Sequence, residues 1–168
     1  MATNSVSLHS LVYKNAATYW IAALFVIGNI ALPQLCHLVP SGGPMLLPIY
    51  FFTLVAAYKY GWKVGLLTAV ASPLVNSALF AMPAPAVLPA ILTKSLLLAA
   101  AAGFAARKFR RVSLLLLLGV VLFYQVIGSA AEWGLTGSLA AALQDFRIGI
   151  PGMLLQILGG YLFIKHLK

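Results

Sequence analysis

Long stretches of this chain contain no charged side chain. No Asp, Glu, Lys or Arg lies between Lys14 and Lys59, in residues 64–93 or in residues 112–131. A transmembrane helix needs roughly 20 mainly apolar residues, so each of the first two stretches can hold one such helix, a turn and part of another. Only 8% of all residues are charged, whereas a typical soluble domain has about 25%. The sequence therefore predicts an integral membrane protein without a soluble domain.

Turn-forming residues and short basic clusters divide the apolar sequence into helix-sized segments. Pro33 marks the expected end of the first helix, because proline lacks the N–H group that a helix interior requires. We expect an all-α protein in which residues 1–168 form one compact bundle of about six transmembrane helices. The expected helices cover residues 16–31, 45–58, 64–80, 90–106, 112–131 and 148–164.

The basic residues fall into alternate connections between these helices. The net charge of +9 could indicate nucleic-acid binding in a soluble protein, but short clusters between apolar segments are typical of topology signals. With a cytoplasmic N-terminus, nine of the eleven basic residues lie on the inner side, and both acidic residues lie outside. The inner basic residues are Lys14, Lys59, Lys63, Arg107, Lys108, Arg110, Arg111, Lys165 and Lys168. This asymmetry predicts that both termini are cytoplasmic and that the chain binds no nucleic acid.

The expected outer connections are longer than the inner ones and rich in Pro, Gly and polar residues. Irregular backbone near a membrane persists where it is buried in protein or lines a cavity. A binding site that opens outward is therefore expected.

Catalytic motifs are missing from the sequence. Glu132 and Asp145 are not spaced as a pair on one helix face, and the chain has no Gly-x-Ser-x-Gly, no phosphate-binding glycine loop and no His-Glu-x-x-His. We expect no enzymatic activity, no cofactor and no ATP hydrolysis by this chain.

A metal site has only weak support. Cys36 and His37 are adjacent, and Met45 and Met82 belong to the same expected outer face. Thioether and thiolate ligands suit copper(I), and imidazole suits nickel or cobalt. The simpler interpretation is that His37 hydrogen-bonds within a polar loop and the methionines fill space. No metal site is predicted, and uptake of cobalt or nickel remains an alternative.

A few polar side chains within or beside the apolar helices are candidates for ligand binding. Lys94 could extend its ammonium to the outer surface, neutralise a carboxylate or phosphate of a ligand, or pair with Glu132. Buried amides such as Asn76 could instead hold helices together. Lys94 and Arg147 would suit an anionic group. The candidate substrate-binding residues are His37, Tyr50, Asn76, Lys94, Gln125, Glu132, Trp133, Arg147 and Gln156, of which Tyr50 and Trp133 could stack on a ring.

Several short motifs resemble the substrate-binding S components of energy-coupling factor (ECF) transporters. The resemblance covers Leu47-Pro48 through Tyr60-Gly61, then Gly65, Ser72-Pro73-Leu74, Ala81-Met82-Pro83 and Gly103. It implies a bacterial cytoplasmic membrane protein that captures a vitamin or related micronutrient from outside. The implied partners are a transmembrane coupling protein and two cytoplasmic ATPases.

In that family the first helix usually presents an Ala-x-x-x-Ala face to the coupling protein. The nearest match here is Thr18-x-x-x-Ala22, with Ala23 beside it. The resemblance therefore implies that Thr18, Ala22 and Ala23 dock the partner. The alternative function is a structural or assembly protein of the membrane that transports nothing.

Overall fold

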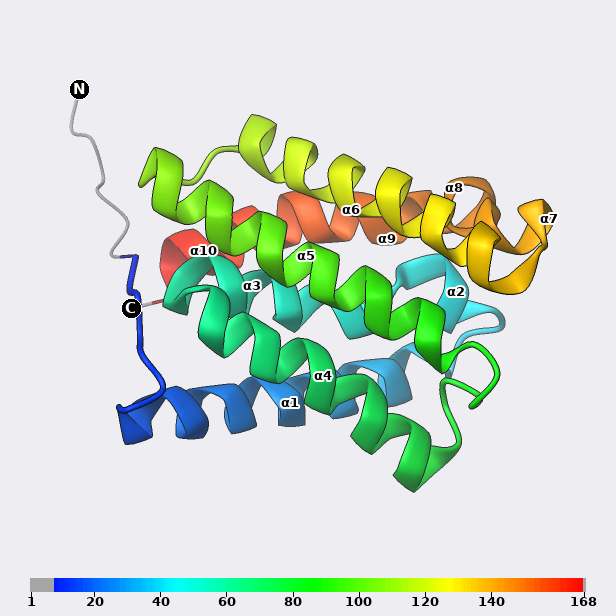
Figure 1. Ribbon diagram of the computed structural model, residues 1–168, viewed down its shortest axis with the longest axis horizontal. Coiled ribbons are helices and arrows are strands. Elements are labelled where there is room, and N and C mark those ends of the chain that lie inside the picture. Colours follow the sequence, from blue (N-terminus) through cyan, green and yellow to red (C-terminus); the bar gives the residue numbers. More distant parts are fainter. Residues whose placement is uncertain (1–7, 168) are drawn as a thin grey trace.

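The computed structural model describes residues 8–167, and this part of the chain is all-helical, with no strand (Figure 1). Four helices are long and apolar enough to cross a membrane: α1 (Ala16–Cys36), α4 (Trp62–Phe80), α5 (Leu88–Phe109) and α6 (Leu114–Thr136). They coincide with four of the six expected spans. The predicted all-α class is confirmed. Residues 8–167 contain four single helices long enough to cross a membrane, compared with the six spans expected.

The other two expected spans are helical but divided. Residues 45–58 lie in α2 (Gly42–Leu46), the 3₁₀ turn η1 (Pro48–Tyr50) and α3 (Phe51–Tyr60). Residues 148–164 lie mainly in three consecutive pieces: α9 (Ile150–Leu154), the π-helical segment η2 (Leu155–Gly159) and α10 (Gly160–His166). The ten residues of α3 extend only about 15 Å, so this helix alone is too short to cross a bilayer. Two short helices, α7 (Leu139–Ala142) and α8 (Gln144–Ile148), connect α6 to α9.

The expected end of the first helix at Pro33 is wrong, because α1 continues through this proline to Cys36. Proline has no N–H group for the carbonyl of Asn29, four residues earlier. The Asn76 side chain of α4 replaces the missing donor, with its Nδ2 2.9 Å from the Asn29 carbonyl oxygen. A hydrogen bond from a neighbouring helix thus allows α1 to continue.

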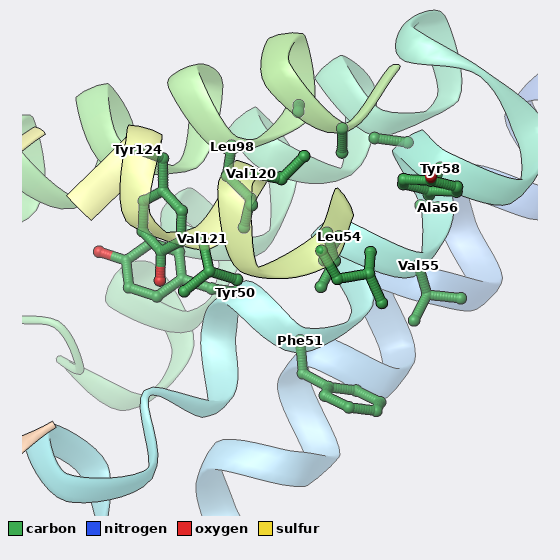
Figure 2. Close-up of a cluster of buried hydrophobic side chains, with 14 of the residues drawn as sticks. Tyr50, Phe51, Leu54, Val55, Ala56, Tyr58, Leu98, Val120, Val121 and Tyr124 are labelled. Atoms are coloured by element: carbon green, nitrogen blue, oxygen red, sulfur yellow. The ribbon is translucent and has the colours of Figure 1, made fainter. Parts of the chain in front are cut away.

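The short helix α3 forms the centre of the bundle. It contacts α1, α4, α5 and α10, and its residues from Leu54 to Tyr58 are completely buried. A helix that is apolar on all sides is stable only when other elements surround it. Figure 2 shows Leu54, Val55, Ala56 and Tyr58 of this helix with side chains of α5 and α6, which belong to the same core: Leu98, Val120 and Val121.

The outer faces of the long helices are apolar as well. On α1 the side chain of Trp20 is 78% exposed, and on α6 that of Leu115 is 77% exposed. Soluble monomers rarely expose large continuous apolar surfaces. The four long helices and their apolar outer faces are typical of a membrane protein.

Charge is separated between the two ends of the bundle. The start of α1, the α3–α4 and α5–α6 connections and the end of α10 lie together, at the left in Figure 1. We call this the basic end, because it carries Lys14, Lys59, Lys63, Arg107, Lys108, Arg110, Arg111 and Lys165. The segments α2, α7 and α8 lie at the opposite end, where α8 carries Asp145. The separation agrees with the alternation found in the sequence.

Candidate functional site

A cavity of about 280 Å³ lies at the end opposite the basic end. Its walls come from the end of α1, from α2 and η1, from the connection before α5, and from α5, α6, α7 and α8. Most of the lining is apolar, which is usual for sites that bind small molecules. The lining residues are Pro33, His37, Gly43, Pro44, Leu47, Pro48, Ile49, Tyr50, Met82, Pro83, Val87, Ala90, Ile91, Lys94, Glu132, Ala141, Gln144 and Asp145.

Three charged side chains meet at the wall of this cavity. The Nζ of Lys94 lies 2.6 Å from Oε2 of Glu132 and 2.8 Å from Oδ2 of Asp145. Lys94 is only 3% exposed, so its ammonium does not reach the outer surface, and the expected pairing with Glu132 is observed. Glu132 and Asp145 are the only acidic residues of the whole chain. Both acidic side chains of the sequence therefore form ion pairs with the same buried lysine.

Three separate elements hold this cluster in place. Lys94 belongs to α5, Glu132 to α6 and Asp145 to α8. Gly128 lies one turn before Glu132, and a Cβ at this position would be 2.5 Å from Cγ of Lys94. The absence of a side chain at Gly128 therefore lets the stem of Lys94 lie against α6 and directs its ammonium toward both carboxylates.

Asp145 is the site residue that sequence reasoning missed. It lies on α8, which α7 separates from α6, so no regular spacing connects it to Lys94. A charge argument points to it, because a buried ammonium needs an acidic partner and the chain offers only two.

The charge balance of the cluster disfavours the anionic ligand expected from Lys94. Its ammonium already contacts two carboxylates, so a ligand carboxylate or phosphate would have to displace one of them. Removing a buried carboxylate from its partner costs several kcal/mol. A neutral or positively charged ligand group avoids this cost.

The backbone at the cavity contains a strained residue. Leu47 has a φ of 47°, in the left-handed region, although it is neither glycine nor asparagine. Its N–H donates to the Gly43 carbonyl at 3.0 Å, and its side chain is 6% exposed. Such conformations persist where surrounding structure enforces them, and they cluster at ligand sites.

Four of the nine candidate binding residues line the cavity: His37, Tyr50, Lys94 and Glu132. Nδ1 of His37 lies 2.6 Å from the Pro33 carbonyl oxygen, as expected for a histidine that hydrogen-bonds within its own segment. Tyr50 is 3% exposed and faces the cavity from η1. These four candidates come from four different segments of the chain.

Gln125 and Gln156 are buried outside the cavity lining. Gln156 lies in the π-helical segment, and its Oε1 accepts a hydrogen bond of 2.9 Å from the hydroxyl of Tyr124. The ring of Tyr124 lies 5.4 Å from that of Tyr50, and Figure 2 shows the two rings side by side. Gln156 is thus connected to the cavity through two tyrosines. Neither side-chain polar atom of Gln125 has a hydrogen-bond partner in the described structure.

The remaining three candidates lie away from the cavity. Asn76 is buried between α4 and α1, where its side-chain amide donates a hydrogen bond to the Asn29 carbonyl. Trp133 is 52% exposed, and Arg147 is also exposed. Neither Trp133 nor Arg147 lines the cavity, so the ring stacking expected of the first and the anion contact expected of the second stay predictions without a place in its wall.

The expected docking residues on α1 face in different directions. Thr18 and Ala22 lie on the buried face, and the Thr18 hydroxyl donates to the Val12 carbonyl at 2.6 Å. Ala23 is exposed. The assignment of Thr18 and Ala22 to a partner surface is therefore wrong, because the bundle itself covers them. The exposed face of α1 carries Tyr19, Trp20 and Leu24 instead.

Residues 8–167 contain no group of three or more His, Cys, Asp or Glu side chains arranged to hold a metal ion. Cys36 is free and buried at the end of α1. No family model, curated protein or solved structure matches this chain.

Proposed function

We propose that this chain is the substrate-binding membrane subunit of an ECF-type importer. It would lie in the bacterial cytoplasmic membrane with six crossings, in which α2–η1–α3 and α9–η2–α10 act as two further spans. The basic end would face the cytoplasm, and the cavity would open outward to capture a vitamin or related micronutrient.

One observation carries the proposal: a mainly apolar cavity at the non-basic end, closed on one side by the buried Lys94–Glu132–Asp145 cluster. Buried charges in a membrane bundle are costly, and they usually mark a ligand or ion pathway. Under the positive-inside rule the basic end faces the cytoplasm. The cavity then lies on the side from which a nutrient arrives.

The cluster also suggests the character of the ligand. Lys94 is already neutralised, so we infer a ligand that is neutral or positively charged where it approaches the cluster. Tyr50 offers an aromatic surface, and apolar residues cover most of the remaining wall. A small heterocyclic molecule meets these requirements.

Native mass spectrometry of the freshly purified protein tests ligand capture. Ala141 lines the cavity from α7, whereas its neighbour Ala140 is exposed and does not line it. We expect a small molecule to co-purify with the wild type and with A140W, and to be absent from A141W, because tryptophan fills the cavity. The mass identifies the compound and hence its charge.

Three results would count against this assignment. If no small molecule accompanies the wild type, the protein is better explained as a structural or assembly component. If A140W and A141W lose the molecule equally, binding does not occur in this cavity. If the molecule is a strong acid, the inference about charge is wrong while ligand capture stands.

Dependence on ATPases tests the importer assignment. The chain has no nucleotide-binding motif, so we expect uptake of the identified compound to stop when the Walker lysine of the partner ATPases is replaced. Uptake that continues in proteoliposomes containing this chain alone would exclude the ECF mechanism.

A further inference from the structure

A second cavity lies at the basic end, separate from the candidate substrate site. Its volume is about 670 Å³, and its walls come from residues 8–10, the start of α4 and the end of α5. The cations Lys63, Arg107 and Arg110 line it, together with His9. Nothing in the proposed importer function uses this cavity.

The walls of this cavity are well defined. The segment beside His9 is fixed to the end of α3 by two backbone hydrogen bonds, from His9 N to the Lys59 carbonyl at 2.7 Å and from Leu11 N to the Tyr60 carbonyl at 3.1 Å. On the other side, a Cβ at Gly103 would lie 2.5 Å from Cβ of Trp62, so α4 and α5 approach closely here. The cavity is therefore part of the folded bundle.

In the part of the chain that the structure describes, no acidic side chain pairs with these three cations. Both ion pairs in residues 8–167 belong to Lys94, in the other cavity. The chain has no acidic side chain besides Glu132 and Asp145. Lys63 lies over two aromatic rings, with Nζ 5.1 Å from the centre of Tyr13 and 5.9 Å from that of Trp62. No acidic side chain is thus left to balance the positive charge of this cavity, which suits an anionic group of another molecule.

The position of the cavity indicates the kind of molecule. Tyr13 and Trp62 beside it are about 40% exposed, and aromatic side chains of this kind gather where a membrane meets water. Further along α4 and α5 the exposed side chains include apolar ones such as Val70 and Phe104. Basic pockets between helices at such an interface bind the phosphate groups of anionic lipids.

We propose that the cavity lined by Lys63, Arg107 and Arg110 binds the phosphate headgroup of an anionic phospholipid. The phosphate contacts the guanidinium and ammonium groups, and the acyl chains follow the apolar outer faces of α4 and α5. The proposal requires the bundle to lie in a membrane, and it is independent of any importer function.

The test uses the full-length protein in a mild detergent with equal amounts of phosphatidylglycerol and phosphatidylcholine that share the same acyl chains. Native mass spectrometry counts the lipids that stay bound. Each basic side chain near an anionic surface contributes about fivefold in affinity, so we expect the wild type to prefer phosphatidylglycerol by about tenfold or more.

Two double variants with the same change in charge locate the site. R107Q/R110Q removes two cations that line the cavity, whereas K108Q/R111Q removes two from the same five-residue cluster, 107–111, that do not line it. We expect the first variant to lose most of the preference and the second to retain it. The melting temperature of both variants without added lipid controls for misfolding. If R107Q/R110Q does not fold, R107K/R110K keeps the charge but loses the guanidinium geometry, and should retain a reduced preference.

Inorganic phosphate distinguishes the lipid from a free anion. We expect phosphate at millimolar concentration to leave the bound phosphatidylglycerol in place, because it lacks acyl chains. Equal binding of the two lipids, equal loss in both double variants, or displacement of the lipid by phosphate would each overturn the proposal.

Discussion

Lys94 shows how one buried charge organises its surroundings. Its ammonium contacts Glu132 and Asp145, which come from two other helices. A buried ion pair contributes little net stability compared with apolar residues, but breaking it by removing one partner is costly. The cluster therefore makes the arrangement of α5, α6 and α8 sensitive to a single side chain.

Replacing Lys94 with methionine keeps the shape of the side chain and removes its charge. We expect K94M to lower the free energy of unfolding by about 3–5 kcal/mol, because two carboxylates, only 13% and 12% exposed, then remain without a cation. Thermal unfolding in detergent, followed by tryptophan fluorescence, measures the loss. The triple variant K94M/E132Q/D145N should recover most of it. A triple variant that is no more stable than K94M would show that charge is not the cause.

The hydrogen bond of Asn76 matters because of Pro33. Asn76 Nδ2 donates to the Asn29 carbonyl, which has no helical donor because residue 33 is proline. N76L leaves that carbonyl unpaired, and a loss of about 1–3 kcal/mol is expected. In a P33A background alanine supplies the missing N–H, so N76L should cost less there. A double-mutant cycle of unfolding free energies measures this coupling. If the effects of N76L and P33A are additive, Asn76 does not replace the N–H group that proline lacks.

At the scale of elements, close contacts of small residues determine where helices meet. Gly65 of α4 lies directly against Ala57 of α3, and Gly103 of α5 lies against Trp62 of α4. Small residues let helix backbones approach closely in a membrane, where hydrophobic attraction between helices is absent. The contact between α5 and α6 matters most for the site, since it positions Lys94 beside Glu132.

Two glycines of α6 allow this contact to be tested with a matched control. A Cβ at Gly128 would lie 2.5 Å from Cγ of Lys94, whereas a Cβ at Gly119 would meet nothing within 4 Å. We expect G128A to lower the melting temperature and to weaken retention of the co-purified molecule. G119A should leave both unchanged or raise stability slightly, because alanine favours helices more than glycine by about 1 kcal/mol. Equal effects of the two variants would contradict the assigned role of Gly128.

At the scale of the whole molecule, basic and acidic side chains gather at opposite ends of the bundle. One end collects basic connections, and the other holds the cavity with both carboxylates. The excess of Lys and Arg in one set of connections sets the orientation of a membrane protein, with the basic side in the cytoplasm. The orientation that we propose is therefore a property of the entire chain.

Accessibility of single cysteines tests that orientation. In a C36A background we expect R110C, at the basic end, to resist an impermeant thiol reagent in intact cells, because the proposed orientation places it on the cytoplasmic side. G137C, at the opposite end, should react. Mass spectrometry of the purified protein detects the label, and permeabilised cells provide the control in which both positions react. Labelling of R110C alone in intact cells would reverse the proposed topology.

The sequence by itself determined the all-helical class and the separation of charge, and four of its six expected spans coincide with the long apolar helices. These features depend on local composition: twenty apolar residues without a charge form a helix wherever backbone groups must pair with each other. The pairing of Lys94 with Glu132 could also be expected from the sequence, because a buried ammonium needs an acidic partner and the chain has only two acidic side chains.

Only the tertiary structure decided the features that depend on contacts between distant segments. It continued α1 past Pro33 through a side chain 43 residues further along, brought Asp145 to Lys94, and turned Thr18 and Ala22 into the bundle. It also excluded Trp133 and Arg147 from the cavity. The physical reason is that helical periodicity fixes which residues share a face, whereas packing against other helices fixes which face is buried and which polar groups meet there.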